Sequence, residues 1–170
     1  MAQITLPALS RKVLAAARAR GLKIATAESC TGGMVAMNLT AIAGSSDVVD
    51  RGFVTYSNAA KMAMLGVPER LLAVHGAVSA EVAAAMAEGA LRASDADLSV
   101  SITGVAGPGG GSGEKPVGLV HLAVASRDGQ VNRIERRYDP TLARSGIRKA
   151  ATRDALLLLL GLAEGVSISA

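Results

Sequence analysis

Residues 24 to 34 read IATAESCTGGM, and the rest of the chain is arranged around this stretch. Its first four residues are small or branched, which suits a buried strand, and Gly32-Gly33 lets the backbone turn sharply into a helix. A hydroxyl here lies at the carboxyl end of a strand, where α/β proteins bind ligands, and faces helix N–H groups that stabilise anions. The stretch predicts an active-site corner at Ser29, while helix capping by Ser29 and Thr31 is the alternative interpretation.

The composition fits one domain with an aliphatic core. The chain has 170 residues, 50% of them apolar, and three aromatic residues, Phe53, Tyr56 and Tyr138. This length and apolar content fill one core, so a single domain over residues 1–170 is expected. The net charge is +4, which permits an anionic small ligand. The basic residues are dispersed and so few aromatic rings cannot build a base-stacking platform, so we expect no nucleic-acid partner.

Cysteine usage and hydropathy indicate the compartment. Cys30 is the single cysteine, which excludes an intrachain disulfide and a cysteine-based zinc site. The opening MAQITLPALSRK lacks the pattern of a signal peptide. The longest apolar run, Ala155 to Ala163, is far shorter than the ~20 residues that a spanning helix needs. A cytoplasmic protein with no membrane partner is expected.

Helical and strand patterns alternate along the chain. Helices are expected over 7–20, 33–42, 58–65, 79–93 and 141–162, and strands over 24–27, 52–56 and 97–103. Asn58 is expected to cap its helix, and Pro68 to start a further turn. The alternating runs VGLVHLAVA and QVNRIERRY flank Arg127-Asp128-Gly129, which predicts a hairpin. The expected fold class is α/β, a three-layer α/β/α arrangement with a mixed, mostly parallel sheet and a late antiparallel hairpin.

Ser29 needs a base before its hydroxyl can act as a nucleophile. His75 falls in a turn pattern and His121 inside a strand pattern, so both are interpreted as structural. Lys61 is the better candidate because it lies five residues after Tyr56 in YSNAAK and its other neighbours are apolar. Apolar surroundings lower the pKa of a lysine and make the neutral amine available. The alternative is a lysine that snorkels from an amphipathic helix.

Two other groups of residues qualify for chemistry. Cys30 is a competing nucleophile, but neighbouring residues at a strand end point in opposite directions and free cysteines are most often small buried hydrophobes. The loop 104–116, GVAGPGGGSGEKP, resembles a phosphate-binding loop but fits neither the Gly-Lys-Ser/Thr nor the G-x-G-x-x-G pattern. Its N–H groups can still wrap a small anion, and an ordinary surface loop is the alternative.

Four motifs in order resemble the CinA C-terminal domain family in its free-standing form, and they span nearly the whole chain. They are AESCTGG at 27–33, TYSNAAK at 55–61, TGVAGPGGGSGEKPVG at 103–118, and the pair Arg144 and Arg148. Members of this family are known as nicotinamide mononucleotide amidohydrolases. The family's usual loop has Thr-Pro where this chain has Ser112-Gly113, so the resemblance says less about loop conformation than about chemistry.

The resemblance implies an amidase that uses Ser29 as nucleophile, Lys61 as its base and Tyr56 as a hydrogen-bonding assistant, with no cofactor and no metal. Backbone amides near Thr31, Gly32 and Gly33 would stabilise the oxyanion. The residues implied to bind the nucleotide substrate are Thr31, Gly32, Gly33, Thr103, Gly104, Ala106, Gly107, Gly109, Gly110, Arg144 and Arg148. One of the two arginines would face the phosphate, and either is equally interpretable as a solvated surface charge.

Two other functions compete with this one. A non-catalytic nucleotide-binding module in a competence or DNA-damage response would keep the crevice without turnover, but the joint presence of Ser29, Tyr56 and Lys61 argues against it. A metal-dependent pyrophosphatase would need a carboxylate cluster, whereas Asp95 and Asp97 are interpreted as capping a strand. The apolar final helix and alanine-rich surfaces make a homodimer or higher homo-oligomer the expected assembly.

Overall fold

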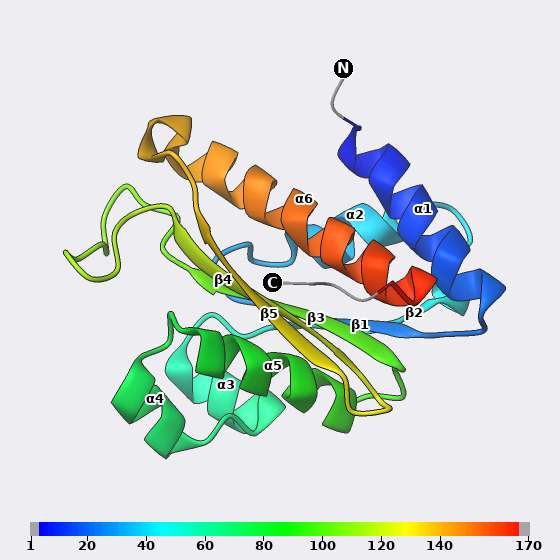
Figure 1. Ribbon diagram of the computed structural model, residues 1–170, viewed down its shortest axis with the longest axis horizontal. Helices are drawn as coiled ribbons and strands as arrows, with labels where there is room; N and C mark the ends of the chain where they lie inside the picture. Colours follow the sequence, from blue (N-terminus) through cyan, green and yellow to red (C-terminus); the bar gives the residue numbers. More distant parts are fainter. Residues whose placement is uncertain (1–3, 167–170) are drawn as a thin grey trace.

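The computed structural model describes residues 4–166 and consists of a central sheet between two layers of helices (Figure 1). The five strands are β1 (Ile24–Glu28), β2 (Val49–Val54), β3 (Leu98–Gly104), β4 (Leu119–Ser126) and β5 (Val131–Arg137), in the order β2-β1-β3-β4-β5. β1 pairs in parallel with β2 and β3, whereas β4 is antiparallel to β3 and β5 is antiparallel to β4. Only β4 therefore runs against the others, which confirms the predicted α/β fold with its mixed, mostly parallel sheet and late hairpin.

The helices divide between the two faces of the sheet (Figure 1). One face is covered by α1 (Leu6–Ala19), α2 (Met34–Thr40) and α6 (Ala143–Glu164). The other is covered by α3 (Asn58–Leu65), α4 (Glu69–His75) and α5 (Ala80–Arg92). None of the helices in residues 4–166 combines the length and apolarity needed to cross a membrane.

Small side chains bring α5 close to the sheet. Ala25 and Ala27 of β1 point toward the same cluster as the alanines of α5, because alternate residues of a strand share one face. On the neighbouring strand, Ser99 and Ser101 face the same way, and their hydroxyls donate to carbonyls of α5 at 2.7 and 2.5 Å. Buried hydroxyls that find backbone acceptors cost little, so this polar pair fits an otherwise aliphatic core.

The predicted helix starts lie within two residues of those in the structure, and one predicted cap differs. Ser57, not Asn58, caps α3, because its Oγ accepts a hydrogen bond from the N–H of Ala60 at 3.0 Å. The last helix begins at Ala143, after a short 3₁₀ turn over Pro140–Leu142. The first difference matters for function, because it leaves the side chain of Asn58 free of the capping role.

Candidate active site

Ser29 directly follows β1 at the carboxyl edge of the parallel strands. Its N–H donates to the carbonyl of Ile102 at 2.9 Å, which extends the β1–β3 ladder by one residue and fixes the backbone of the serine. The residue is 9% exposed. The ladder therefore places the serine hydroxyl at the end of the sheet where parallel α/β proteins bind their ligands, as predicted.

Lys61 approaches this hydroxyl from α3. Its side chain is 1% exposed, and its Nζ donates to Oγ of Ser29 at 3.0 Å and to the carbonyl of Thr55 at 2.9 Å. Within residues 4–166 no carboxylate forms an ion pair with this amine. Burial lowers the pKa of Lys61 because the charged form loses its hydration. The predicted pairing of the two side chains is thus present, and the pKa of the amine is shifted in the direction that a general base requires.

Cys30, next in the chain, has a different environment. It is buried against the aliphatic cluster on the α6 side of the sheet, and burial raises the pKa of its thiol to about 11. The thiolate is the nucleophilic form of cysteine, so this raised pKa makes Cys30 a poorer nucleophile than an ordinary thiol, although it also lines the pocket that opens over Ser29.

A pocket of about 290 Å³ opens over Ser29 and Lys61. Its lining contains Tyr56, Asn58, Thr103, Arg144 and much of the glycine-rich loop, and it has no acidic residue. The predicted substrate-binding residues that line it are Thr103, Gly104, Ala106, Gly107, Gly109, Gly110 and Arg144. Neither histidine does so, and no three His, Cys, Asp or Glu side chains of residues 4–166 are grouped to hold a metal ion.

Arg144 bridges two sides of this pocket. Its Nη1 donates to the carbonyl of Gly107 at 2.7 Å, and its Nη2 donates to the hydroxyl of Tyr56, also at 2.7 Å. Tyr56 is 60% exposed, and the described residues include no hydrogen bond between its hydroxyl and Ser29 or Lys61. The structure therefore places Tyr56 beside the arginine, and the predicted assistance to Ser29 stays a prediction.

Four predicted binding residues lie outside the pocket lining: Thr31, Gly32, Gly33 and Arg148. The N–H of Gly32 donates to the carbonyl of Ser29 at 3.0 Å within the turn, and its predicted role in an oxyanion hole stays a prediction. Arg148 donates through Nε to the carbonyl of Cys30 at 3.1 Å and through Nη2 to that of Thr31 at 2.9 Å. The guanidinium therefore binds the turn, and its predicted contact with a phosphate stays a prediction.

Glu28 is a residue that sequence reasoning missed. It is fully buried, and its two carboxylate oxygens accept from the N–H groups of Val35 at 2.9 Å and Ala36 at 3.1 Å. One feature of the sequence pointed to this role. Helix α2 begins after Gly33, which has no side chain to cap the helix, so another acceptor is needed for the first N–H groups. A carboxylate nearby in the sequence was the natural replacement.

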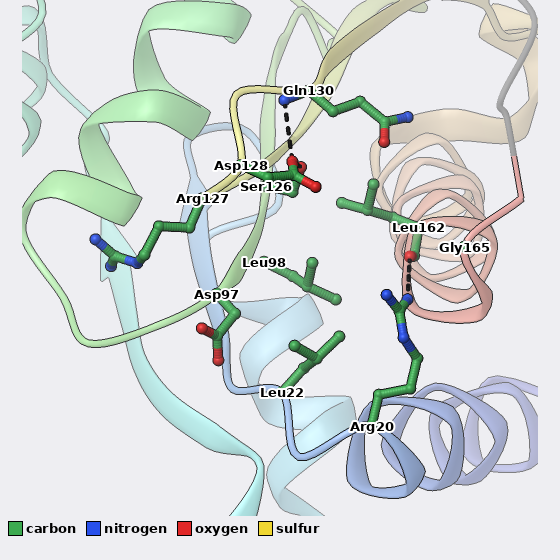
Figure 2. Close-up of a pocket in the computed structure, with 10 residues that line it drawn as sticks. All are labelled: Arg20, Leu22, Asp97, Leu98, Ser126, Arg127, Asp128, Gln130, Leu162 and Gly165. Carbon is green, nitrogen blue, oxygen red and sulfur yellow. Dashed lines mark hydrogen bonds between the residues drawn. The ribbon is translucent and has the colours of Figure 1, made fainter.

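A second hollow, of about 400 Å³, lies at the opposite end of the sheet (Figure 2). Arg20 lines it and donates to the carbonyls of Leu162 and Ala163 at the end of α6. Arg127 lines it too, and donates to main-chain carbonyls that include that of Ala96. Both arginines therefore bind main-chain carbonyls, and the hydroxyl of Ser126 in the same lining donates to the carboxylate of Asp128.

Comparison with known proteins agrees with the predicted family. The model of the CinA C-terminal domain matches residues 7–163. The chain is 54% identical to the nicotinamide-nucleotide amidohydrolase PncC of Escherichia coli K12, over 89% of this chain and 90% of that protein. It is also 54% identical to a CinA-like protein of Synechococcus, over 89% of this chain and 36% of that protein, so it spans about a third of such relatives.

A solved structure is similar over its whole length. The competence/damage inducible protein CihA from Agrobacterium tumefaciens shares 52% identity with a TM-score of 0.90, covering 95% of this chain and 99% of that one. The order of elements, the Ser29–Lys61 pair and these matches lead to one assignment. The chain belongs to the CinA C-terminal domain family.

Proposed function

We propose that the chain is an amidohydrolase that converts the carboxamide of nicotinamide mononucleotide to a carboxylate and releases ammonia. The observation that carries this proposal is the buried contact of 3.0 Å between Lys61 Nζ and Ser29 Oγ, in which no carboxylate of residues 4–166 forms an ion pair with the amine. The similarity to the E. coli nicotinamide-nucleotide amidohydrolase, over nearly the whole of both chains, supports the choice of substrate.

The proposed reaction passes through an acyl-enzyme. Neutral Lys61 accepts the proton of Ser29 as Oγ attacks the carboxamide carbon, and the C–N bond breaks as Lys61 returns the proton to the departing ammonia. A water molecule then attacks the ester carbon and gives a proton to Lys61. The bond to Oγ breaks, Ser29 regains its proton from Lys61, and the carboxylic acid leaves. Overall, one amide and one water molecule give one carboxylic acid and one ammonia.

The charges around the pocket support an anionic substrate. Arg144 is bound to a carbonyl and a hydroxyl, both neutral, so no acidic side chain of residues 4–166 compensates its charge. We assign it the phosphate of the nucleotide, because a guanidinium forms strong charge-assisted hydrogen bonds with phosphate oxygens. The N–H groups of the loop from Gly104 to Gly110 line the same pocket and are proposed to hold the rest of the nucleotide.

The competing proposal is a nucleotide-binding module without turnover, and the similar protein of Agrobacterium tumefaciens is named a competence/damage inducible protein. The Ser29–Lys61 contact favours the enzyme, because a binding module has no need to bury an amine against a hydroxyl. Cytoplasmic location and assembly into a homodimer also remain proposals. The second is supported by exposed apolar side chains such as Met37 and Leu142, and sedimentation of the purified chain tests it.

Ammonia release from nicotinamide mononucleotide tests the function. The purified chain should release ammonia with and without a chelator, and the nucleotide product should carry a carboxylate. Binding of the nucleotide without release of ammonia would instead establish the binding module.

A further inference from the structure

Two charged side chains that stay outside the pocket hold the turn that carries Ser29. Glu28 precedes the turn and binds it from the α2 side, while Arg148 reaches it from α6. Neither residue lines the space above Ser29 and Lys61. Their partners are main-chain groups only, so any effect on the reaction must come through the geometry of the turn.

Glu28 closes the turn into a ring. Its oxygens accept from Val35 and Ala36, the second and third residues of α2, so residues 29–34 are enclosed between the carboxylate and the helix it caps. No lysine or arginine of residues 4–166 pairs with this buried carboxylate. The N–H groups of the helix end therefore supply its stabilisation, and charge-assisted bonds of this kind are stronger than neutral ones.

Arg148 fixes the opposite side of the ring. Its planar guanidinium donates to two successive carbonyls, those of Cys30 and Thr31, which immediately follow the serine. A Cβ at Gly32 would lie 3.3 Å from Nη2 of Arg148, and Gly32 has φ +58°, so glycine permits both the turn and the close approach of the arginine. A fork of two donors defines the orientation of the peptide planes in a way that a single point charge cannot.

We propose that Glu28 and Arg148 are positioning residues that hold Oγ of Ser29 within reach of Lys61. The proposed base lies on α3, on the other side of the sheet from α2 and α6, so the distance from Lys61 Nζ to Ser29 Oγ depends on where the turn is held. A misplacement of about 1 Å in a reacting group can cost about a hundredfold in rate. The proposal rests on the proposed function only where nicotinamide mononucleotide is used as the probe.

Steady-state kinetics and binding separate positioning from substrate contact. Arg148→Lys should lower kcat by about tenfold to a hundredfold and leave KM within about threefold, with the apparent pKa of kcat unchanged. In the Ser29→Ala background, adding Arg148→Lys should change the Kd for nicotinamide mononucleotide by less than about threefold. A Kd weakened by about tenfold or more would place Arg148 on the ligand and overturn the proposal.

Covalent labelling gives a readout that needs no natural substrate. A fluorophosphonate reacts when Oγ attacks phosphorus and fluoride leaves, and intact mass spectrometry follows the adduct on Ser29. Glu28→Gln offers one acceptor for two N–H groups, and we expect it and Arg148→Lys to label at least about tenfold more slowly than wild type. Should Glu28→Gln not fold, Arg148→Lys alone decides.

Matched controls exclude a general loss of structure. Arg153→Lys alters another α6 arginine that donates to a main-chain carbonyl, that of Ile4, and Asp97→Asn alters a carboxylate that accepts the N–H of Lys23. Both should label within about twofold of wild type. Equal labelling rates in wild type and Arg148→Lys would overturn the proposal. Labelling of wild type without ammonia release would refute the proposed substrate alone, and the labelling rates would still decide the role of Glu28 and Arg148.

Discussion

The corner at Ser29 and the hollow at the opposite end of the sheet use arginine in the same way. Arg148 donates to the carbonyls of Cys30 and Thr31. Arg20 donates to the carbonyl of Leu162, as Figure 2 shows, and to that of Ala163. The hollow is the larger of the two cavities, at about 400 Å³ against about 290 Å³. Neither the volume of a cavity nor the presence of arginines therefore distinguishes a functional site from a purely structural contact in this molecule.

The charges of the lining residues do distinguish the two cavities. The far hollow contains Asp97 and Asp128 together with its arginines, so opposite charges are present in one lining. The pocket over Ser29 contains Arg144 and Lys61 with no acidic residue. A buried amine without a counter-ion is costly unless it gives up its proton, and a neutral amine beside a hydroxyl is a base. The comparison thus locates chemistry where positive groups lack acidic partners.

The largest effect is expected from removing the nucleophile. Ser29→Ala should lower ammonia release by about a thousandfold or more while the Kd for nicotinamide mononucleotide changes by less than about tenfold, because the hydroxyl acts mainly in the transition state. Enzymatic ammonia assays and calorimetry measure the two quantities. Activity within about tenfold of wild type would move the nucleophile to Cys30, so Cys30→Ala belongs in the same series.

Changing the base should have the next largest effect. Lys61→Arg keeps the positive charge, but arginine cannot give up its proton at accessible pH and so cannot accept one from Ser29. We expect kcat to fall to less than about a tenth, a barrier change above about 1.4 kcal/mol. If the variant keeps a larger share of the wild-type kcat, Lys61 is a positioning cation and another residue must act as the base.

Arg144 should affect binding more than chemistry. Arg144→Ala should raise KM by about tenfold to a hundredfold, because a hydrogen bond to a charged group contributes about 1.5–3 kcal/mol. Nicotinamide riboside, which lacks the phosphate, should be a poor substrate for wild type, and the variant should no longer discriminate between the two. Equal loss on both substrates would remove Arg144 from the phosphate.

Sequence reasoning reached the pair Ser29 and Lys61 because local patterns locate both: one at a strand end, the other in an apolar stretch after Tyr56. The layers of the fold and the late hairpin were also predicted from local periodicity, and the structure confirms both. The role of Glu28 was missed although its partners Val35 and Ala36 are near in the sequence and the start of α2 lacks a side-chain cap. The partners of Arg148 could not be predicted, because they depend on where distant main-chain groups lie. Arg148 meets carbonyls 117 and 118 positions away, and no pattern within a helix encodes such a contact.

We expect the smallest effect on activity from a substitution in the hollow at the opposite end of the sheet. Arg20→Ala should lower the free energy of unfolding by about 1 kcal/mol, since Arg20 binds the last carbonyls of α6 at an exposed helix end. Its kcat/KM should stay within about twofold of wild type. Urea unfolding and steady-state kinetics measure both. A large loss of activity at unchanged stability would contradict the distinction drawn between the two regions.

The titration of Lys61 itself tests the central claim most directly. Carbon-13 NMR of the lysine Cε groups, with the Lys61 signal assigned by its absence in Lys61→Arg, reports the charge on this amine as pH is raised. Because burial lowers its pKa, the signal should titrate well below the ordinary lysine value of about 10.4, and ammonia release should rise with pH over the same range. A midpoint at or above about 10.4 would mean a charged amine at neutral pH, and Lys61 could not be the base.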